Sequence, residues 1–301
     1  MIKKLLLVCL LCSTALAQYD QKPMLGEQID RTNLSATGLE ALWLCNEGGG
    51  NTVADSSGNG SHGTFVADTT WASGKWGPCL SFDGTGDWVT CGTTPQIQGV
   101  AQFSFSVWHK SADYSTDRVV LAHFGSGEDK IFYLRHRSAR KYAWVLYNAA
   151  QASVENGSST TYGDYAWHHI VGTYDGAAMH LYVDGVLVDD AARAQSGSLV
   201  ASSDNLCYIG AGGLLSPTYG QIDMPALWSH ALSVSEITDL YANPFQMFER
   251  PTPELWVEAG GEEPAGTPRF SVIFMSTLPI WLVTGLAISM GYTNVDKRKA
   301  A

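Results

Sequence analysis

Basic residues are scarce in this sequence. Its 301 residues include 18 Lys and Arg against 29 Asp and Glu, which gives a formal net charge of −11. Domains that bind nucleic acids display clustered positive charge, so this balance argues against DNA or RNA as a partner. Anionic lipid head groups would repel such an acidic domain as well.

The motifs of several common catalytic and metal centres are absent downstream of residue 17. We find no Cys-x-x-Cys or His-x-x-x-His spacing of a zinc site and no Gly-x-Ser-x-Gly of a serine hydrolase. A β-glucanase-like site would need alternating carboxylates on one strand, and no Glu-x-Asp-x-Glu occurs. We therefore expect no enzymatic activity, and a divergent glycoside hydrolase is the least favoured interpretation.

The two ends of the chain predict export and membrane anchoring. Residues 1–17 resemble a secretory signal peptide, with Lys3 and Lys4 before an apolar run and a small-x-small cleavage site. Residues 270–292 carry no charge, and as a helix they would be about 34 Å long, enough to cross a bilayer. A basic tail, residues 293–301, follows on the expected cytoplasmic side. The prediction is a protein anchored at the cell surface; the alternative is a tail docked into an assembly partner.

Short strands and tight turns dominate the rest of the sequence. Two Asp-Gly steps, Asp175-Gly176 and Asp184-Gly185, predict turns after strands at 167–174 and 178–183. Ser233 with Glu236 forms a capping box that predicts a short helix at 233–241. Further strands are expected at 39–47, 103–110, 118–124, 131–137, 141–148, 186–189, 205–211 and 220–232, with a turn-rich loop at 48–64.

The cysteines predict disulfides. The segment "CLSFDGTGDWVTC" is nearly symmetric about Thr85, so a hairpin folded there would place Cys79 opposite Cys91. Closing so short a loop should stabilise the protein by roughly 3 kcal/mol. The remaining pair, Cys45 and Cys207, would form a second bridge in an exported protein.

Six segments then occur in an order that is similar to a known family. They are "ALWLCNEGGGNTVADSSGNGSHGT", "CLSFDGTGDWVTCG", "FSFSVWHK", "WHHIVGTYDGAAMHLYVDGVLV", "YIGA" and "GQIDMPALWSHALSVSEITDLY". Together they resemble the laminin-G-like, concanavalin A-like jelly-roll family, which includes the pentraxins, and "LYANPFQMFERP" is similar to the junction after such domains in bacterial and phage-associated surface proteins. The resemblance implies an all-β fold: a two-sheet antiparallel jelly-roll sandwich with a short C-terminal helix.

These observations divide the chain into six parts. The boundaries predicted from the sequence are a signal peptide at 1–17, a leader segment at 18–37, the jelly roll at 38–242, a Pro-containing acidic linker at 243–269, the hydrophobic segment at 270–292 and the basic tail at 293–301.

The sequence favours a non-catalytic module that binds glycan or matrix polymers. The alternative is a structural or adhesive subunit of a surface or virion assembly, in which the domain would pack against copies of itself. A pattern similar to Trp167-His168-His169 serves packing in the family, so we expect a structural role for these histidines. Sugar binding needs exposed aromatic rings, and the candidates are Trp71, Trp76, Trp108, Tyr142, Trp144 and Tyr182.

Calcium is the one cofactor that the sequence favours. Similar folds often hold a calcium ion at a sheet edge, and oxygen-rich loops suit this cation. We expect at most one structural ion, with Asp223 as the leading side-chain ligand. The candidate ligands are Glu47, Asp55, Asp83 and Asp223, although Asp55 and Asp83 could instead cap turns.

Overall fold

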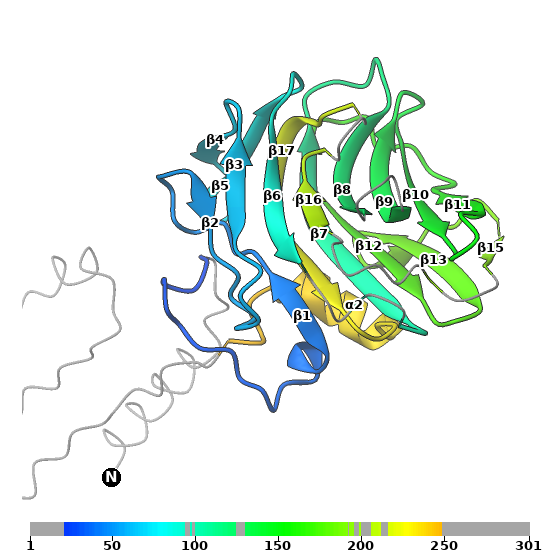
Figure 1. The fold of residues 1–301 in the computed structure, drawn as a ribbon, viewed down its shortest axis with the longest axis horizontal. Coiled ribbons are helices and arrows are strands. Elements are labelled where there is room, and N and C mark those ends of the chain that lie inside the picture. The colour runs from blue at the N-terminus through cyan, green and yellow to red at the C-terminus, as the bar shows by residue number, and fades with distance from the viewer. Residues whose placement is uncertain are drawn as a thin grey trace, which may run out of the picture. The chain divides into compact units, whose positions relative to one another are not determined.

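The protein folds into a β-sandwich. The structure is a computed structural model, and it describes residues 21–93, 97, 100–124, 130–191, 193–195, 199, 206–211 and 216–248. Within these ranges the strands form two antiparallel sheets, accompanied by a 3-10 helix, η1 (Leu34–Ala36), and an α-helix, α2 (Val234–Ala242) (Figure 1). The predicted all-β jelly-roll sandwich with a short C-terminal helix is confirmed.

The first sheet has nine strands in the described part of the chain. Its main path runs β14-β13-β12-β7-β17-β5-β4, with β1 added beside β17 and β15 beside β13. The strands are β1 (Leu39–Leu42), β4 (Thr70–Ser73), β5 (Pro78–Asp83), β7 (Phe103–Ser111), β12 (His168–Tyr174), β13 (Ala178–Val183), β14 (Val186–Leu187), β15 (Arg193–Ala194) and β17 (Tyr219–Trp228).

The second sheet has eight strands within the same ranges, in the order β11-β10-β9-β8-β16-β6-β3-β2. One of them, β2, lies within the turn-rich loop that the sequence predicts at 48–64, and another, β3, begins there. The strands are β2 (Thr52–Val53), β3 (Gly63–Val66), β6 (Trp88–Thr93), β8 (Arg118–Phe124), β9 (Lys130–Arg137), β10 (Lys141–Tyr147), β11 (Ser153–Gly157) and β16 (Leu206–Ile209).

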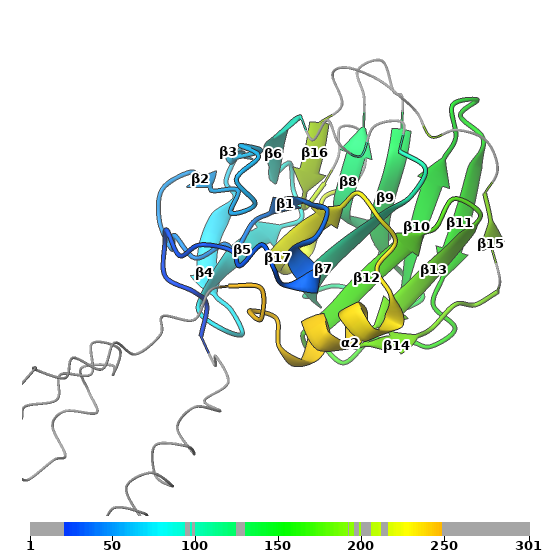
Figure 2. The ribbon, with the colours of Figure 1, turned by 90° about the horizontal axis from the view of Figure 1, so that it is seen from below.

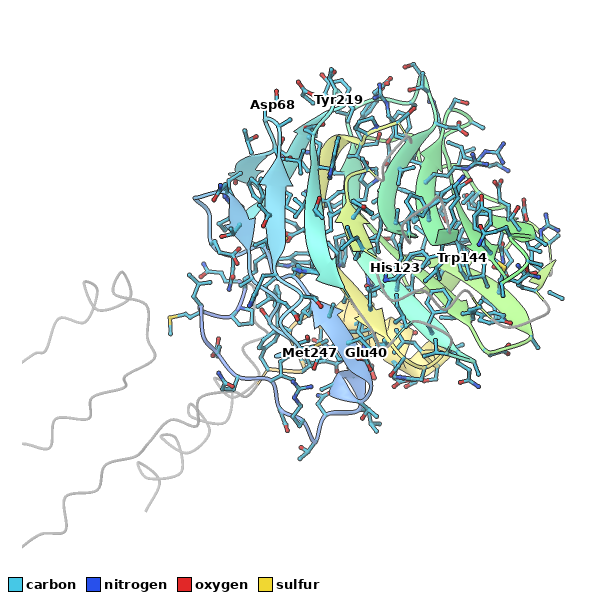
Figure 3. All side chains as sticks on the ribbon, viewed as in Figure 1. Glu40, Asp68, His123, Trp144, Tyr219 and Met247 are labelled. Atoms are coloured by element: carbon cyan, nitrogen blue, oxygen red, sulfur yellow. The ribbon has the colours of Figure 1, made fainter. Side chains whose placement is uncertain are left out.

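The core lies between the two sheets and follows from side-chain alternation. Successive residues of a strand point to opposite faces, so Phe103 and Phe105 of β7 point inward together. They meet Phe132 and Trp144 from the opposite sheet, with ring centroids 5.1 Å apart for Phe105 and Phe132. All four side chains are buried, and Figure 3 places Trp144 among the strands in the body of the sandwich.

Local signals in the sequence locate the turns and the helix correctly. The Asp175-Gly176 and Asp184-Gly185 steps join β12 to β13 and β13 to β14, as predicted. Gly176 and Gly185 both have positive φ, which glycine adopts without a steric penalty. The capping box of Ser233 and Glu236 is present at the start of α2, with each side chain bonded to the other residue's backbone amide.

The predicted hairpin between Cys79 and Cys91 is wrong. Cys79 lies on β5 in the nine-stranded sheet, whereas Cys91 lies on β6 in the eight-stranded sheet. The residues between these strands carry the chain from one sheet to the other, so neither strand is the other's partner. Alternation and symmetry show which residues share a face of a strand, but they do not show which strand lies beside it.

Neither predicted disulfide is present in the described part of the chain. Cys45, Cys79, Cys91 and Cys207 are all buried as free thiols. Cys207 is the register partner of Cys91 on neighbouring strands, not of Cys45. Burial raises the pKa of the Cys79 thiol to about 12, so this side chain is an uncharged group in the core.

The outer faces of the two sheets are covered differently. Helix α2, the residues that follow it and the N-terminal segment pack on the nine-stranded sheet, whose outer side we call the covered face (Figure 2). Here Ile237 and Phe245 are buried against Trp108 and Trp228. The outer side of the eight-stranded sheet, which we call the open face, has an apolar cluster built only from residues of the sheet itself, among the described residues.

The compact domain extends beyond the range 38–242 that the sequence suggests. At its N-terminal side, the buried Lys22 ammonium lies 2.5 Å from the buried Asp223 carboxylate. At the other end, Met247 and Phe248 are buried, and Phe248 forms a β-bridge with Ile29. Residues on both sides of the predicted boundaries therefore contribute to the covered face.

The predicted membrane-anchored localisation is contradicted. In the part of the chain that the structure describes, no helix combines the length and the apolar character needed to cross a bilayer. The signal peptide predicted at 1–17, most of the linker at 243–269, the segment at 270–292 and the basic tail at 293–301 lie outside the described residues.

Candidate functional site

The open face carries a row of aromatic side chains on four neighbouring strands. We call Tyr208 of β16, Phe124 of β8, Tyr133 of β9 and Tyr147 of β10 the aromatic row. Successive ring centroids along it lie 6.2, 6.3 and 6.3 Å apart. The three tyrosines are half-buried, and Phe124 is buried between Tyr208 and Tyr133, so part of each tyrosine remains exposed.

Strand alternation places these residues on the outer side of the sheet. Phe132 and Leu134 point into the core, so Tyr133 between them points out. Cys207 and Ile209 likewise belong to the core, which turns Tyr208 to the same outer side. On the neighbouring strand β8, Ala122 is the register partner of Tyr133, and Phe124 packs beside its ring.

A network of charged side chains adjoins the row at Tyr133. Arg135 pairs with both Asp117 and Glu155, and Arg137 pairs with Glu155 at 2.8 Å. The Arg135 guanidinium also lies 5.9 Å from the centre of the Tyr133 ring. A row of aromatic rings, each tilted by 40–68° to the next, thus lies beside several hydrogen-bond donors and acceptors. A polar ligand with an apolar face requires such a combination.

Burial favours the neutral form of two tyrosine hydroxyls of the row, those of Tyr147 and Tyr208. Burial raises the pKa of Tyr147 to about 12, and the neighbouring Tyr133 adds to this effect. Burial also raises the pKa of Tyr208. A neutral phenol both donates and accepts a hydrogen bond, so these groups suit ligands that carry hydroxyls.

Most of the aromatic residues proposed from the sequence do not present a free ring. Trp144 and Tyr142 are buried in the core between the sheets, while Trp108 and Tyr182 are buried in the covered face. Trp71 and Trp76 are half-buried, and the structure places them at separate positions. Trp71 packs on Phe65 at 5.3 Å, and Trp76 packs on Trp108 at 4.6 Å beneath the Lys75 ammonium.

The two adjacent histidines, His168 and His169, make packing and hydrogen-bond contacts on opposite faces of β12. His169 points to the covered face, where it stacks on Trp108 and bonds the Ser106 hydroxyl at 2.7 Å. His168 points to the other face and bonds Asp184 and Asp164 at 2.7 and 2.9 Å. Burial opposes a charge on His168, but the two carboxylates outweigh it and raise the pKa of this histidine.

The four predicted calcium ligands are dispersed. Asp55 accepts hydrogen bonds from the amides of Leu42, Ser57 and Ser61, so it caps the turn in which it lies. Glu47 accepts a bond from the Ala54 amide. The carboxylate of Asp223 faces an ammonium group instead of a metal, because Lys22 reaches it from the N-terminal segment.

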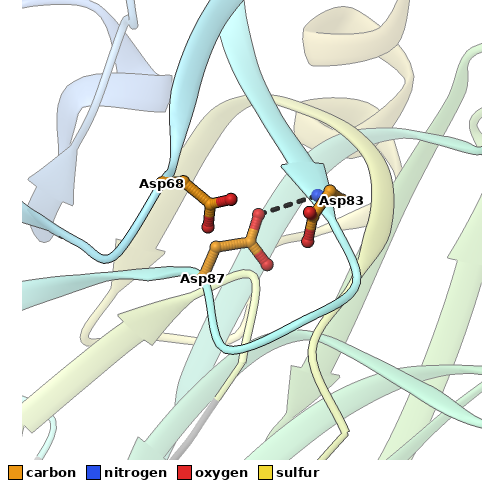
Figure 4. A group of neighbouring side chains, drawn as sticks. All are labelled: Asp68, Asp83 and Asp87. Carbon is orange, nitrogen blue, oxygen red and sulfur yellow. Dashed lines mark hydrogen bonds between the residues drawn. The ribbon is translucent and has the colours of Figure 1, made fainter.

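Asp83 alone among them lies in an acidic cluster. Its carboxylate approaches those of Asp68 and Asp87 (Figure 4) at the rim of the sandwich, where Figure 3 places Asp68 and Tyr219. Sequence reasoning missed Asp68 and Asp87, and it also missed the aromatic row. The alternation of Phe132, Tyr133 and Leu134 could have separated Tyr133 from its two apolar neighbours, but nothing in the sequence shows which outer face remains open.

The two antiparallel sheets and their strand order define a lectin-like β-sandwich. The family model described as the concanavalin A-like lectin/glucanases superfamily, Laminin_G_3, matches residues 83–238, and the protein belongs to this family. No curated protein matches the sequence significantly.

Solved structures with the same fold include sugar-binding and toxin domains. Domain 4 of AbnA, a GH43 extracellular arabinanase from Geobacillus stearothermophilus in complex with arabinotriose, is 18% identical with a TM-score of 0.55, over 67% of this chain and 98% of that one. The binding domain of Paraclostridial Mosquitocidal Protein 1 is 12% identical with a TM-score of 0.58, over 70% and 53%. The botulinum neurotoxin serotype D ligand binding domain in complex with N-acetylneuraminic acid is 14% identical with a TM-score of 0.54, over 69% and 51%. At these identities the likeness concerns the fold alone.

Proposed function

We propose that this protein is a non-catalytic glycan-binding module and that the aromatic row is its binding surface. The observation that carries the proposal is the row itself: three half-buried tyrosines and Phe124 at regular spacing on the open face. Sugar rings have apolar C–H faces that stack on aromatic rings, while their hydroxyls hydrogen-bond to neighbouring polar groups. Two of the similar structures are described with a bound sugar, which supports the same ligand class.

The charged groups beside the row favour binding over glycoside hydrolysis. A glycosidase needs one carboxyl that stays protonated as an acid, beside a second that is ionised. Asp117 and Glu155 are the carboxylates of the network, and both are engaged by Arg135. Burial acts to raise the pKa of Asp117, but the Ser138 amide and Arg135 outweigh it and the pKa is lowered. This carboxylate is therefore ionised and unsuited to donate a proton.

The proposal is tested by glycan binding with the full-length protein. A panel of soluble polysaccharides and sialylated and arabinose-containing oligosaccharides is screened, and the tightest binder is measured by isothermal titration calorimetry. We expect Tyr133→Ala and Tyr208→Ala to weaken binding at least roughly tenfold, since each removes a stacking ring worth about 1.4 kcal/mol or more. Tyr219→Ala is the matched control, because Tyr219 is 43% exposed and lies outside the row.

Two results would overturn the proposal. One is a screen in which no glycan binds the folded protein. The other is glycan binding that both row variants retain in full, which would place the site elsewhere. Concentration-dependent self-association that disappears in Tyr133→Ala would instead favour a structural or adhesive subunit that uses the same surface.

A further inference from the structure

Two of the four buried thiols lie opposite each other on neighbouring strands. Cys91 of β6 and Cys207 of β16 are register partners in an antiparallel pair within the eight-stranded sheet. Two residues further along, Val89 and Ile209 are partners as well, and all four side chains belong to the core between the sheets. Because alternate residues of a strand share a face, both thiols point inward from directly opposite positions.

Directly opposite residues of an antiparallel pair have the spacing that a disulfide needs. Their Cα atoms lie about 4.5 or 5.5 Å apart, depending on whether the two residues exchange hydrogen bonds. A disulfide joins Cα atoms that are roughly 4.4–6.8 Å apart. Cys91 and Cys207 can therefore be joined across the two strands with little movement of the backbone.

The other described cysteines have no such partner. Cys79 lies on β5 in the nine-stranded sheet, where its register partner is Ala72 of β4. Cys45 follows β1 and lies outside the strands, and its Sγ contacts the carbonyl oxygen of Trp43 at 3.4 Å. Among the cysteines that the structure describes, only Cys91 and Cys207 face each other across two paired strands.

The surroundings of this pair decide when it can react. Both side chains are 0% exposed. Burial raises the pKa of the Cys91 thiol well above its usual value, and the adjacent Cys207 thiol adds to this effect. Since the thiolate is the reactive form, a buried neutral pair reacts slowly with oxidants in the folded protein. Oxidation is favoured while the chain folds, when the thiols are still accessible and the strands bring them together.

We propose that Cys91 and Cys207 are an oxidation site, which closes as a cross-strand disulfide when the chain folds in the presence of a small disulfide such as oxidised glutathione. One cysteine thiolate attacks the oxidant, which forms a mixed disulfide and releases one small thiol. The thiolate of the second cysteine then attacks the sulfur of the first and releases the other small thiol. Two protein thiols lose two electrons in all, and the oxidant takes up these electrons and the two protons to become two thiols.

The bridge would attach β16 covalently to β6 beside the aromatic row. β16 has only four residues, and Tyr208 of the row directly follows Cys207. The disulfide would close a loop of roughly 115 residues, and cross-links over long loops restrict the unfolded chain the most. We therefore expect the oxidised protein to be more stable than the reduced protein, with the same strand register.

The test compares full-length protein refolded from urea in a glutathione redox buffer with the same protein refolded in dithiothreitol. Peptide mapping by mass spectrometry without reduction should identify a linked Cys91–Cys207 peptide only in the first sample, with Cys45 and Cys79 free in both. The melting temperature of the oxidised sample should be roughly 5–15 °C higher than that of the reduced sample.

Variants separate this pair from the other thiols. Cys207→Ala should lose the rise in melting temperature, whereas Cys79→Ala, a matched change at a buried cysteine of the other sheet, should keep it. Should Cys207→Ala fail to fold, the double variant Cys45→Ala with Cys79→Ala still decides the matter, since it should give the same linked peptide and the same rise as the wild type.

The proposal is overturned by free thiols at both Cys91 and Cys207 after oxidative refolding, or by mapping in which either one is joined mainly to another cysteine. A rise in melting temperature that Cys207→Ala retains in full would also overturn it. The proposal does not depend on glycan binding, because both thiols point into the core and neither is exposed on the open face.

Discussion

Both the covered face and the open face of the sandwich carry outward-pointing aromatic side chains, but these are buried on the covered face and partly exposed on the open face. On the covered face, Trp108 and Trp228 point outward from their strands, yet both are at most 2% exposed beneath α2 and the terminal segments. On the open face, Tyr133 and Tyr208 also point outward and remain half-buried. Outward aromatic residues therefore serve packing on one sheet and are available to a ligand on the other. The difference comes from segments that are remote in sequence from these strands.

The largest expected effect concerns the contact that holds the N-terminal segment on the covered face. Lys22→Met should lower the free energy of unfolding by about 3–5 kcal/mol, because it leaves the buried Asp223 carboxylate without its partner. Burial already raises the pKa of Asp223 to about 7 despite Lys22, so the deficit should shrink at pH 5, where Asp223 is neutral. Urea denaturation at pH 8 and pH 5 measures both effects.

A double variant tests whether the lost stability comes from the unpaired Asp223 carboxylate. Lys22→Met combined with Asp223→Leu removes both charges and should recover much of the lost stability. A double variant that is as unstable as Lys22→Met at pH 8 would show that Lys22 acts through its other bonds, to the carbonyls of Cys45 and Pro78.

An intermediate effect is expected from acid, through His169 beneath the covered face. Burial lowers the pKa of this histidine from 6.5 to about 3, so it stays neutral in the folded protein while the unfolded chain takes up a proton below pH 6.5. Its contribution to stability is therefore complete above pH 6.5 and declines as the pH falls. Between pH 6.5 and 5.5 the free energy of unfolding of the wild type should fall by roughly 1 kcal/mol more than that of His169→Gln.

The free energy of unfolding is measured against pH for the wild type and for His169→Gln, and the two profiles are compared. The comparison is needed because carboxyls with raised pKa values stabilise the folded protein as the pH falls, opposite to the effect of His169. Asp223 is one of them, and it is unchanged in His169→Gln. Parallel profiles for the wild type and the variant would contradict a neutral, buried His169.

The smallest effect on stability is expected on the open face. Tyr133→Ala should lower the free energy of unfolding by about 1 kcal/mol or less, since the ring is half-buried and leaves no enclosed cavity. Trp228→Ala, the matched change on the covered face, should cost about 3–5 kcal/mol. Similar losses in the two variants, measured by urea denaturation, would mean that the open face is packed as tightly as the covered face.

Local chemistry made much of the fold predictable. The alternation in "FSFSVWHK" puts Phe103, Phe105 and Val107 on one face of a strand and Trp108 on the other, and the structure has the first three in the core between the sheets. The two Asp-Gly steps and the capping box of α2 act over a few residues, so their outcome depends little on the rest of the chain. The order of six family-like segments indicated the jelly roll.

The candidate sites were less accessible from the sequence. Among the residues of the aromatic row and the acidic cluster of Asp68, Asp83 and Asp87, only Asp83 was foreseen, and it was grouped with Glu47, Asp55 and Asp223. Asp68 and Asp83 are fifteen positions apart and meet because two strands separate them and return the chain to the same rim. Similarly, Tyr133 and Tyr208 share the open face only because β16 inserts between β6 and β8.

The sequence by itself determined the strand faces, the tight turns, the helix start and the family, because these depend on residue period and on contacts between near neighbours. Tertiary structure alone decided which strands pair and which outer face is covered. It placed Cys79 and Cys91 in different sheets, turned Asp223 toward Lys22 and buried Trp108 beneath α2. Each of these outcomes depends on contacts between segments far apart in the chain, and strand period carries no information about such contacts.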